Sequence, residues 1–244
     1  MVHRRNHPAP QSIHEAGLPM SQQRITLATP LSLRSSFSFP LQDAQARREV
    51  LIGAMWLLVP VLGWLLNMGH RIQMVHNMHA GRPAWPAWEN PRALMWHGAV
   101  TFTGMAFYGA PGLSLMLAGL WLDVDALLVA GVLLWLGAVI AIPGYMTHYC
   151  KAFDPAEIFN PLRALRRVFE GGRAYWHAWS IALCAMALSL LGLLGLGVGF
   201  LASSVWFWQV AGFSFATVFT VQLDPAEPTS PADGHGRVGL QHDR

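Results

Sequence analysis

Histidines are the side chains of this sequence with the clearest capacity for chemistry. Eleven of its 244 residues are histidine, and imidazoles from separate helices can bind a transition metal or haem iron. His97, His148 and His177 fall at similar depth at the ends of three different expected helices, so they are candidate cofactor ligands. His76 and His79 lie three residues apart on one helix, which makes them a candidate metal-binding pair.

An interfacial role explains the same histidines without a cofactor. Trp96, Tyr149 and Trp176 adjoin the three candidate ligands in the sequence. Side chains with an apolar body and a polar tip gather where a membrane meets water. The only carboxylates near these histidines in the sequence are Glu89 and Asp154. We therefore expect no haem and no metal, and we keep a haem-binding or metal-binding membrane protein as an alternative.

Enzymatic motifs are missing from the whole sequence. It contains no GxSxG, no HExxH and no glycine-rich phosphate loop. We assign no catalytic residue and expect the protein not to be an enzyme. An ionisable residue deep inside a membrane span would favour transport, and the apolar segments contain none. Broken helices at Pro60, Pro111 and Pro143 nevertheless keep a transporter or permease subunit as an alternative.

The elements that must position these side chains are long apolar segments. Hydrophobic residues make up 53% of the chain and charged residues only 12%. A membrane-spanning helix needs about 20 consecutive apolar residues, and charges are missing from 50–70, 93–122, 126–150 and 174–223. These tracts predict an all-α, polytopic transmembrane helix bundle over residues 47–223. Its apolar segments are 50–68, 94–122, 126–149, 175–196 and 203–223.

The distribution of Lys and Arg predicts how these segments cross the membrane. Basic residues precede the first segment and also occur at 71–92 and 151–173, but the turn at 123–125 has none. Cytoplasmic loops carry an excess of basic residues. The pattern fits four full spans if segment 50–68, with Pro60 at its centre, is re-entrant or interfacial. Both termini are then cytoplasmic. Five full spans are the alternative.

Both tails and the second basic loop have distinct compositions. Residues 1–46 are Arg-, Pro- and Ser-rich and predict a disordered cationic tail, and 224–244 predict a second disordered tail. In the loop, residues 162–169 form an amphipathic helix whose Arg163, Arg166 and Arg167 are placed to contact lipid headgroups. The net charge of +3 therefore indicates anionic lipid as a partner and not nucleic acid.

A resemblance to a known family rests on three stretches. They are Asn67 to His70, the run from Gly81 to Trp88, and Gly144-Tyr145 with the following stretch 153–169. With these features the chain resembles a family of uncharacterised bacterial multi-span membrane proteins, over roughly residues 50–223. The resemblance implies a membrane bundle in the bacterial inner membrane and no particular activity. We expect a structural, accessory or interaction role in a membrane assembly, with other membrane proteins or a second copy as partners.

Overall fold

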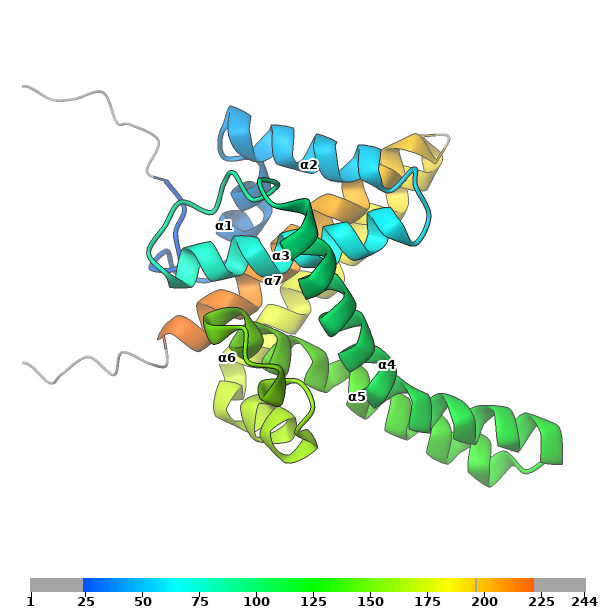
Figure 1. Cartoon of the computed structure of the whole chain (residues 1–244). Helices are drawn as coiled ribbons and strands as arrows, with labels where there is room; N and C mark the ends of the chain where they lie inside the picture. The colour runs from blue at the N-terminus through cyan, green and yellow to red at the C-terminus, as the bar shows by residue number, and fades with distance from the viewer. Residues whose placement is uncertain (1–23, 196, 222–244) are drawn as a thin grey trace, which may run out of the picture.

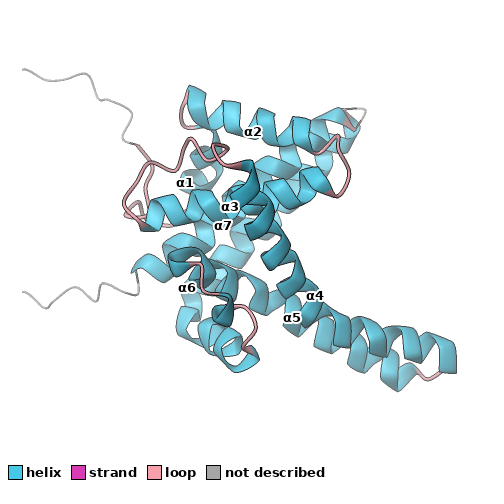
Figure 2. Cartoon of the chain, in the orientation of Figure 1, coloured by secondary structure: helices cyan, strands magenta, loops and turns pink. Residues whose placement is uncertain are grey.

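The computed structural model describes residues 24–195 and 197–221, and all regular structure within these ranges is helical (Figure 2). The prediction of an all-α fold is confirmed. The helices are α1 (Leu33–Ser38), α2 (Ala44–Trp56), α3 (Leu62–His79), α4 (Pro91–Leu122), α5 (Asp125–Ala152), α6 (Pro161–Leu191) and α7 (Val198–Val221), with short 3₁₀ turns at Phe39–Leu41, Pro155–Glu157 and Gly192–Leu194.

Helices α4, α5, α6 and α7 are long and apolar enough to cross a membrane. The predicted four spans are confirmed, and the chain is an integral membrane protein. Asn90 and Asn160 cap α4 and α6 through their side chains, and each is followed by a proline at the first helical position. At Gly172 the backbone is not helical, so α6 bends between its basic first part and its apolar second part.

The first apolar segment is a helical hairpin and not a straight span, as the central proline predicted. Helix α2 ends at Trp56, the turn 57–61 contains Pro60, and α3 runs back beside α2. The apolar tip of the hairpin is exposed: Leu58 is 68% and Val61 71% accessible. Helix α3 continues well beyond the predicted end at residue 68 and packs against α4, α5 and α7. Helix α3 therefore carries Arg71, the first arginine after the apolar segment, toward these helices.

The N-terminal tail predicted over residues 1–46 is folded from residue 24 onward, which corrects its boundary. Ser32 and Ser35 cap each other reciprocally at the start of α1. Phe39 is fully buried and stacks on Phe213 of α7 at 4.5 Å between ring centroids. Burial of such apolar side chains offsets the entropy of ordering the segment. Residues 1–23 and the predicted tail 224–244 lie outside the described residues.

The two long hairpins diverge from a common base (Figure 1). Residues 24 and 221 lie at the same end of the bundle, and the turns α4–α5 and α6–α7 lie at the opposite end. Helix α4 packs extensively against α3 and α5, and α6 packs mainly against α7. The outer part of the first hairpin, residues 109–136, projects alone from the bundle. We name this part the α4–α5 arm and the space between it and α6–α7 the wedge.

Candidate functional site

A buried hydrogen bond between two titratable side chains joins α2 and α3. His70 Nε2 and Glu49 Oε2 are 2.8 Å apart, and both side chains are almost completely buried. The same carboxylate oxygen accepts the backbone N–H of Ala87 at 3.2 Å, and its other oxygen accepts the Gln45 amide at 3.0 Å. One carboxylate thereby joins α2, α3 and the loop before α4.

Two tryptophans enclose the His70 imidazole. The ring lies nearly parallel to Trp88 at 4.2 Å and to Trp85 at 5.8 Å between centroids. Trp88 also donates its Nε1–H to the Glu49 carbonyl at 3.3 Å. Sequence reasoning missed this partner because Glu49 is 21 residues from His70, and only the reversal at the hairpin brings them together. Both side chains are almost inaccessible to solvent, so this contact mainly holds α2, α3 and the loop before α4 together.

Two further histidines meet at the C-terminal end of α5. The rings of His76 and His97 each stack on Phe153 at 4.1 Å between centroids, so the phenyl ring lies next to both. His76 Nδ1 bonds the Cys150 carbonyl at 2.7 Å, and His97 Nδ1 bonds the Tyr149 hydroxyl at 2.8 Å. These contacts use one nitrogen of each imidazole and join α3 and α4 to α5.

The three candidate cofactor ligands have separate surroundings. His97 contacts Tyr149, whereas His148 bonds the Gly144 carbonyl at 2.9 Å and lies edge-on to Phe219 of α7. His177 is exposed on α6. In the candidate pair, His79 Nδ1 bonds the Val75 carbonyl of its own helix at 3.0 Å, whereas His76 Nδ1 bonds the Cys150 carbonyl. Within residues 24–195 and 197–221, no three His, Cys, Asp or Glu side chains are grouped as a metal site would require.

The three arginines proposed to contact lipid headgroups form an ion-pair network. Arg163 bonds Glu157 at 3.0 Å, and Arg166 bonds Glu170 at 2.6 Å. Arg167 reaches both carboxylates, at 3.4 and 2.8 Å. Exposed pairs of this kind contribute little to stability. The network orders the start of α6 and leaves one positive charge in excess over its two acids.

Arg71 has the opposite situation, because it lies half-buried where α3 packs against α5 and α7, without a carboxylate partner. No Asp or Glu of the described chain lies within ion-pair distance of it. Its guanidinium carbon sits 4.7 Å from the centre of the Trp208 ring, and one N–H donates to the Met146 sulfur at 3.4 Å. The sequence gives one indication of this placement, since Arg71 directly follows the charge-free tract 50–70. Helix α3 continues past that tract and so carries Arg71 toward the other helices.

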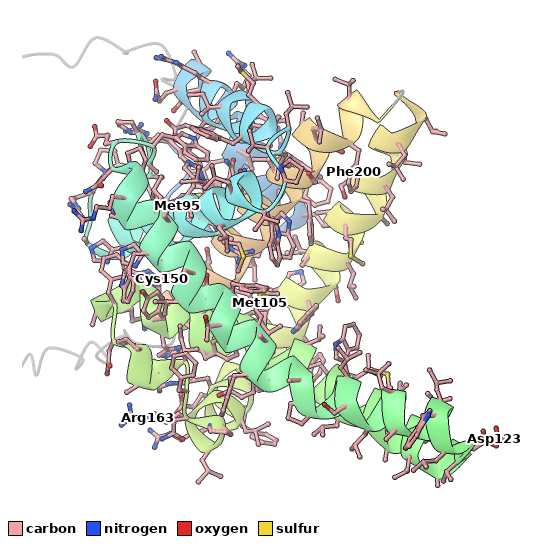
Figure 3. The ribbon with its side chains drawn as sticks, turned by 45° about the vertical axis from the view of Figure 1, so that its right-hand side comes forward. Met95, Met105, Asp123, Cys150, Arg163 and Phe200 are labelled. Atoms are coloured by element: carbon pink, nitrogen blue, oxygen red, sulfur yellow. The ribbon has the colours of Figure 1, made fainter. Side chains whose placement is uncertain are left out.

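Two adjoining cavities share Arg71, Met105 and Trp208 in their walls. The first, of about 320 Å³, also contains polar side chains, and we name it the polar cavity; its polar members are Asn67, His70, Arg71, Ser204 and Gln209. The second, of about 230 Å³, lies between α5, α6 and α7 and is lined almost entirely by apolar groups, so we name it the apolar cavity. Met105 lies where the arm leaves the bundle (Figure 3), which places the shared wall at the base of the wedge.

The cavity pair around Arg71 is the feature of this chain best suited to bind a ligand, because it combines a charged donor with apolar volume inside a membrane bundle. Comparison with known proteins adds no assignment to this geometry: no family model, curated protein or solved structure matches the chain.

Proposed function

We propose that this protein is a structural or accessory component of a membrane assembly, which it joins through the α4–α5 arm. The observation that carries the proposal is a row of small side chains on the outer face of α4. Ala106, at the base of the arm, and Ala110 and Ser114, within it, are spaced four residues apart, and all three are exposed. Small residues at this spacing let two membrane helices approach closely, and no other part of the described chain covers them.

Lipid contact alone does not require such a row. The neighbouring exposed positions of the arm carry large apolar side chains, as lipid-facing helices generally do, with Leu120 67% and Leu133 64% accessible. The row interrupts this pattern on one face of one helix. In the apolar stretches of α4 and α5 that could cross the membrane, only 11% of the residues are buried. The corresponding shares are 28% for α6 and 44% for α7. The first hairpin thus retains the most surface for a partner helix.

Enlarging the small residues tests the proposal. In A106L/A110L, co-purification of the partner from native membranes is expected to fall about tenfold, because the leucines hold the two helices apart. The matched control is A130L, which enlarges an exposed alanine on α5 of the same arm. Quantitative mass spectrometry of the purified material measures the effect. Equal recovery of co-purified proteins from both variants would refute the proposal.

Cross-linking identifies the partner directly. Irradiation of membranes in which A110C carries a benzophenone maleimide should give a cross-linked product, and its mass distinguishes a second 26.9 kDa copy from a different protein. The native Cys150 is buried, and Cys184 lies on α6 away from the arm. A C184S background therefore isolates the engineered cysteine.

We infer that the chain lies in the bacterial inner membrane with both termini in the cytoplasm. The bacterial setting rests on the family resemblance, and the orientation on the basic loop before α6 and the uncharged or acidic turns at the opposite end. In intact cells, a membrane-impermeant maleimide is expected to label D123C in the α4–α5 turn. It should label R163C only after lysis. The reverse pattern would show that the orientation is inverted.

A further inference from the structure

Arg71 presents an uncompensated positive charge to the cavities. A guanidinium stays charged and offers five N–H donors in a planar fork. Among the described residues its contacts are the Trp208 ring and the Met146 sulfur, and neither supplies a negative charge. An ionisable side chain inside a membrane bundle is costly, and such residues mark sites of ligands or ions.

A second, independent observation points to a ligand at the same place. Gln209 of α7 lines the polar cavity, is 1% exposed, and has no hydrogen-bond partner for either its amide nitrogen or its amide oxygen. The Asn67 side-chain oxygen in the same wall is also buried without a partner. Buried polar groups are almost always satisfied in folded proteins. A bound polar group in this cavity would give the Gln209 amide the hydrogen-bond partners that it lacks.

We propose that Arg71 and Gln209 bind the anionic headgroup of a single-chain amphiphile, and that its apolar chain lies in the apolar cavity. The headgroup is a carboxylate or a phosphate, because both accept two parallel N–H bonds from a guanidinium and further bonds from an amide. The apolar cavity shares the Arg71 wall, so a chain attached to the headgroup enters it directly.

The size and the position of the cavities select the ligand further. The apolar cavity, of about 230 Å³, is smaller than the roughly 300–1,000 Å³ of typical ligand pockets, so it accepts one chain and not the two of a phospholipid. Trp208, which lines both cavities, is 39% exposed, so their shared wall reaches the surface of the bundle. An amphiphile dissolved in the bilayer can therefore reach the site laterally. A free anion would leave the apolar cavity unused.

Binding to the purified full-length protein in uncharged detergent tests the proposal. Radiolabelled hexadecanoate is expected to bind saturably and to be displaced by hexadecyl phosphate. Inorganic phosphate and hexadecanol should not displace it, because phosphate lacks the apolar chain and hexadecanol lacks the anionic headgroup. Displacement by inorganic phosphate would show a simple anion site, and equal displacement by hexadecanol would show a nonspecific apolar site. Either result would overturn the proposal.

Three variants locate the bound molecule. R71M is expected to weaken hexadecanoate binding about tenfold, because it removes a charge-assisted pair of hydrogen bonds. R166M, which removes an arginine whose side chain is 73% exposed, is the matched control and should bind like the unmodified protein. Unchanged binding by R71M would overturn the assignment.

The third variant keeps Arg71 and instead reduces the volume of the apolar cavity, which is proposed to hold the chain of the ligand. Val139 lines the apolar cavity, and V139W would fill part of it. We expect weaker binding of hexadecanoate but unchanged binding of octanoate, whose shorter chain needs less volume. Loss of neither ligand, or of both equally, would contradict the placement of the chain. The binding assay uses isolated protein, so its outcome is independent of whether the arm has a partner.

Discussion

An E49A variant is expected to lose about 2–4 kcal/mol of folding free energy, because the substitution leaves the His70 imidazole and the Ala87 N–H buried without a hydrogen-bond partner. The Glu49 and His70 side chains are 2% and 1% exposed, and the carboxylate also accepts the Ala87 backbone N–H. Alanine removes both interactions and leaves a cavity among Trp85, Trp88 and α2. The loss should appear as a lower midpoint of unfolding in mixed detergent–denaturant micelles, followed by tryptophan fluorescence.

Two comparisons separate the Glu49–His70 contact from general effects of substitution. Glu89 is exposed and forms no ion pair among the described residues, so E89A should change stability by less than about 0.5 kcal/mol. The double variant E49L/H70L removes both hydrogen-bonding partners together and should lose less than E49A alone, since no unpaired imidazole remains. An E49A protein that unfolds within about 1 kcal/mol of the unmodified protein would contradict the role assigned to the pair.

The second large effect is expected at the crossing of α3 and α4. A Cβ atom added at Gly69 of α3 would overlap the Leu94 carbonyl of α4, and one added at Gly98 of α4 would overlap the Leu65 carbonyl of α3. Backbone atoms cannot move aside as flexible side chains do, so G69A or G98A must push the two helices apart. We expect each variant to lose about 1–3 kcal/mol of folding free energy, as overpacked interiors do.

Gly137 of α5 is the matched control for these glycines. It lies in a membrane helix, and a Cβ there would have no atom within 4 Å. Alanine is a better helix former than glycine, so G137A should be neutral or stabilise the protein by about 0.5–1 kcal/mol. Differential scanning fluorimetry of the three variants in one detergent makes the comparison. If G69A and G98A unfold at the same temperature as G137A, the close approach of α3 and α4 is wrong.

Helix α3 carries both the residues that these stability variants affect and the arginine of the proposed ligand site. Gly69 and His70 directly precede Arg71, so the helix contacts that they make also hold the guanidinium beside Trp208. A G69A protein that remains folded should therefore bind hexadecanoate more weakly than a G137A protein. This result distinguishes a site positioned by helix packing from a flexible surface arginine.

The sequence by itself determined the fold class and the number of long apolar helices. Spans can be read from it because a lipid-facing helix must be apolar over its whole length and must satisfy its own backbone hydrogen bonds. Local signals also sufficed for Asn160 with Pro161 and for the break at Pro60, because capping and proline geometry depend only on adjacent residues. The tail boundary was wrong, since a serine-rich composition hid the buried Phe39.

Only the tertiary structure decided which side chains meet. Glu49 reaches His70, and Arg71 reaches Trp208, through the reversal of α2 into α3 and the packing of α3 against α7. Neither contact leaves a periodic pattern in the sequence, because each joins two single residues far apart along the chain. The surroundings of the candidate histidines likewise depend on this packing, since His97 contacts Tyr149 and His148 contacts Phe219. Depth along a helix can be read from sequence, but the direction in which a side chain points around the bundle depends on packing between helices.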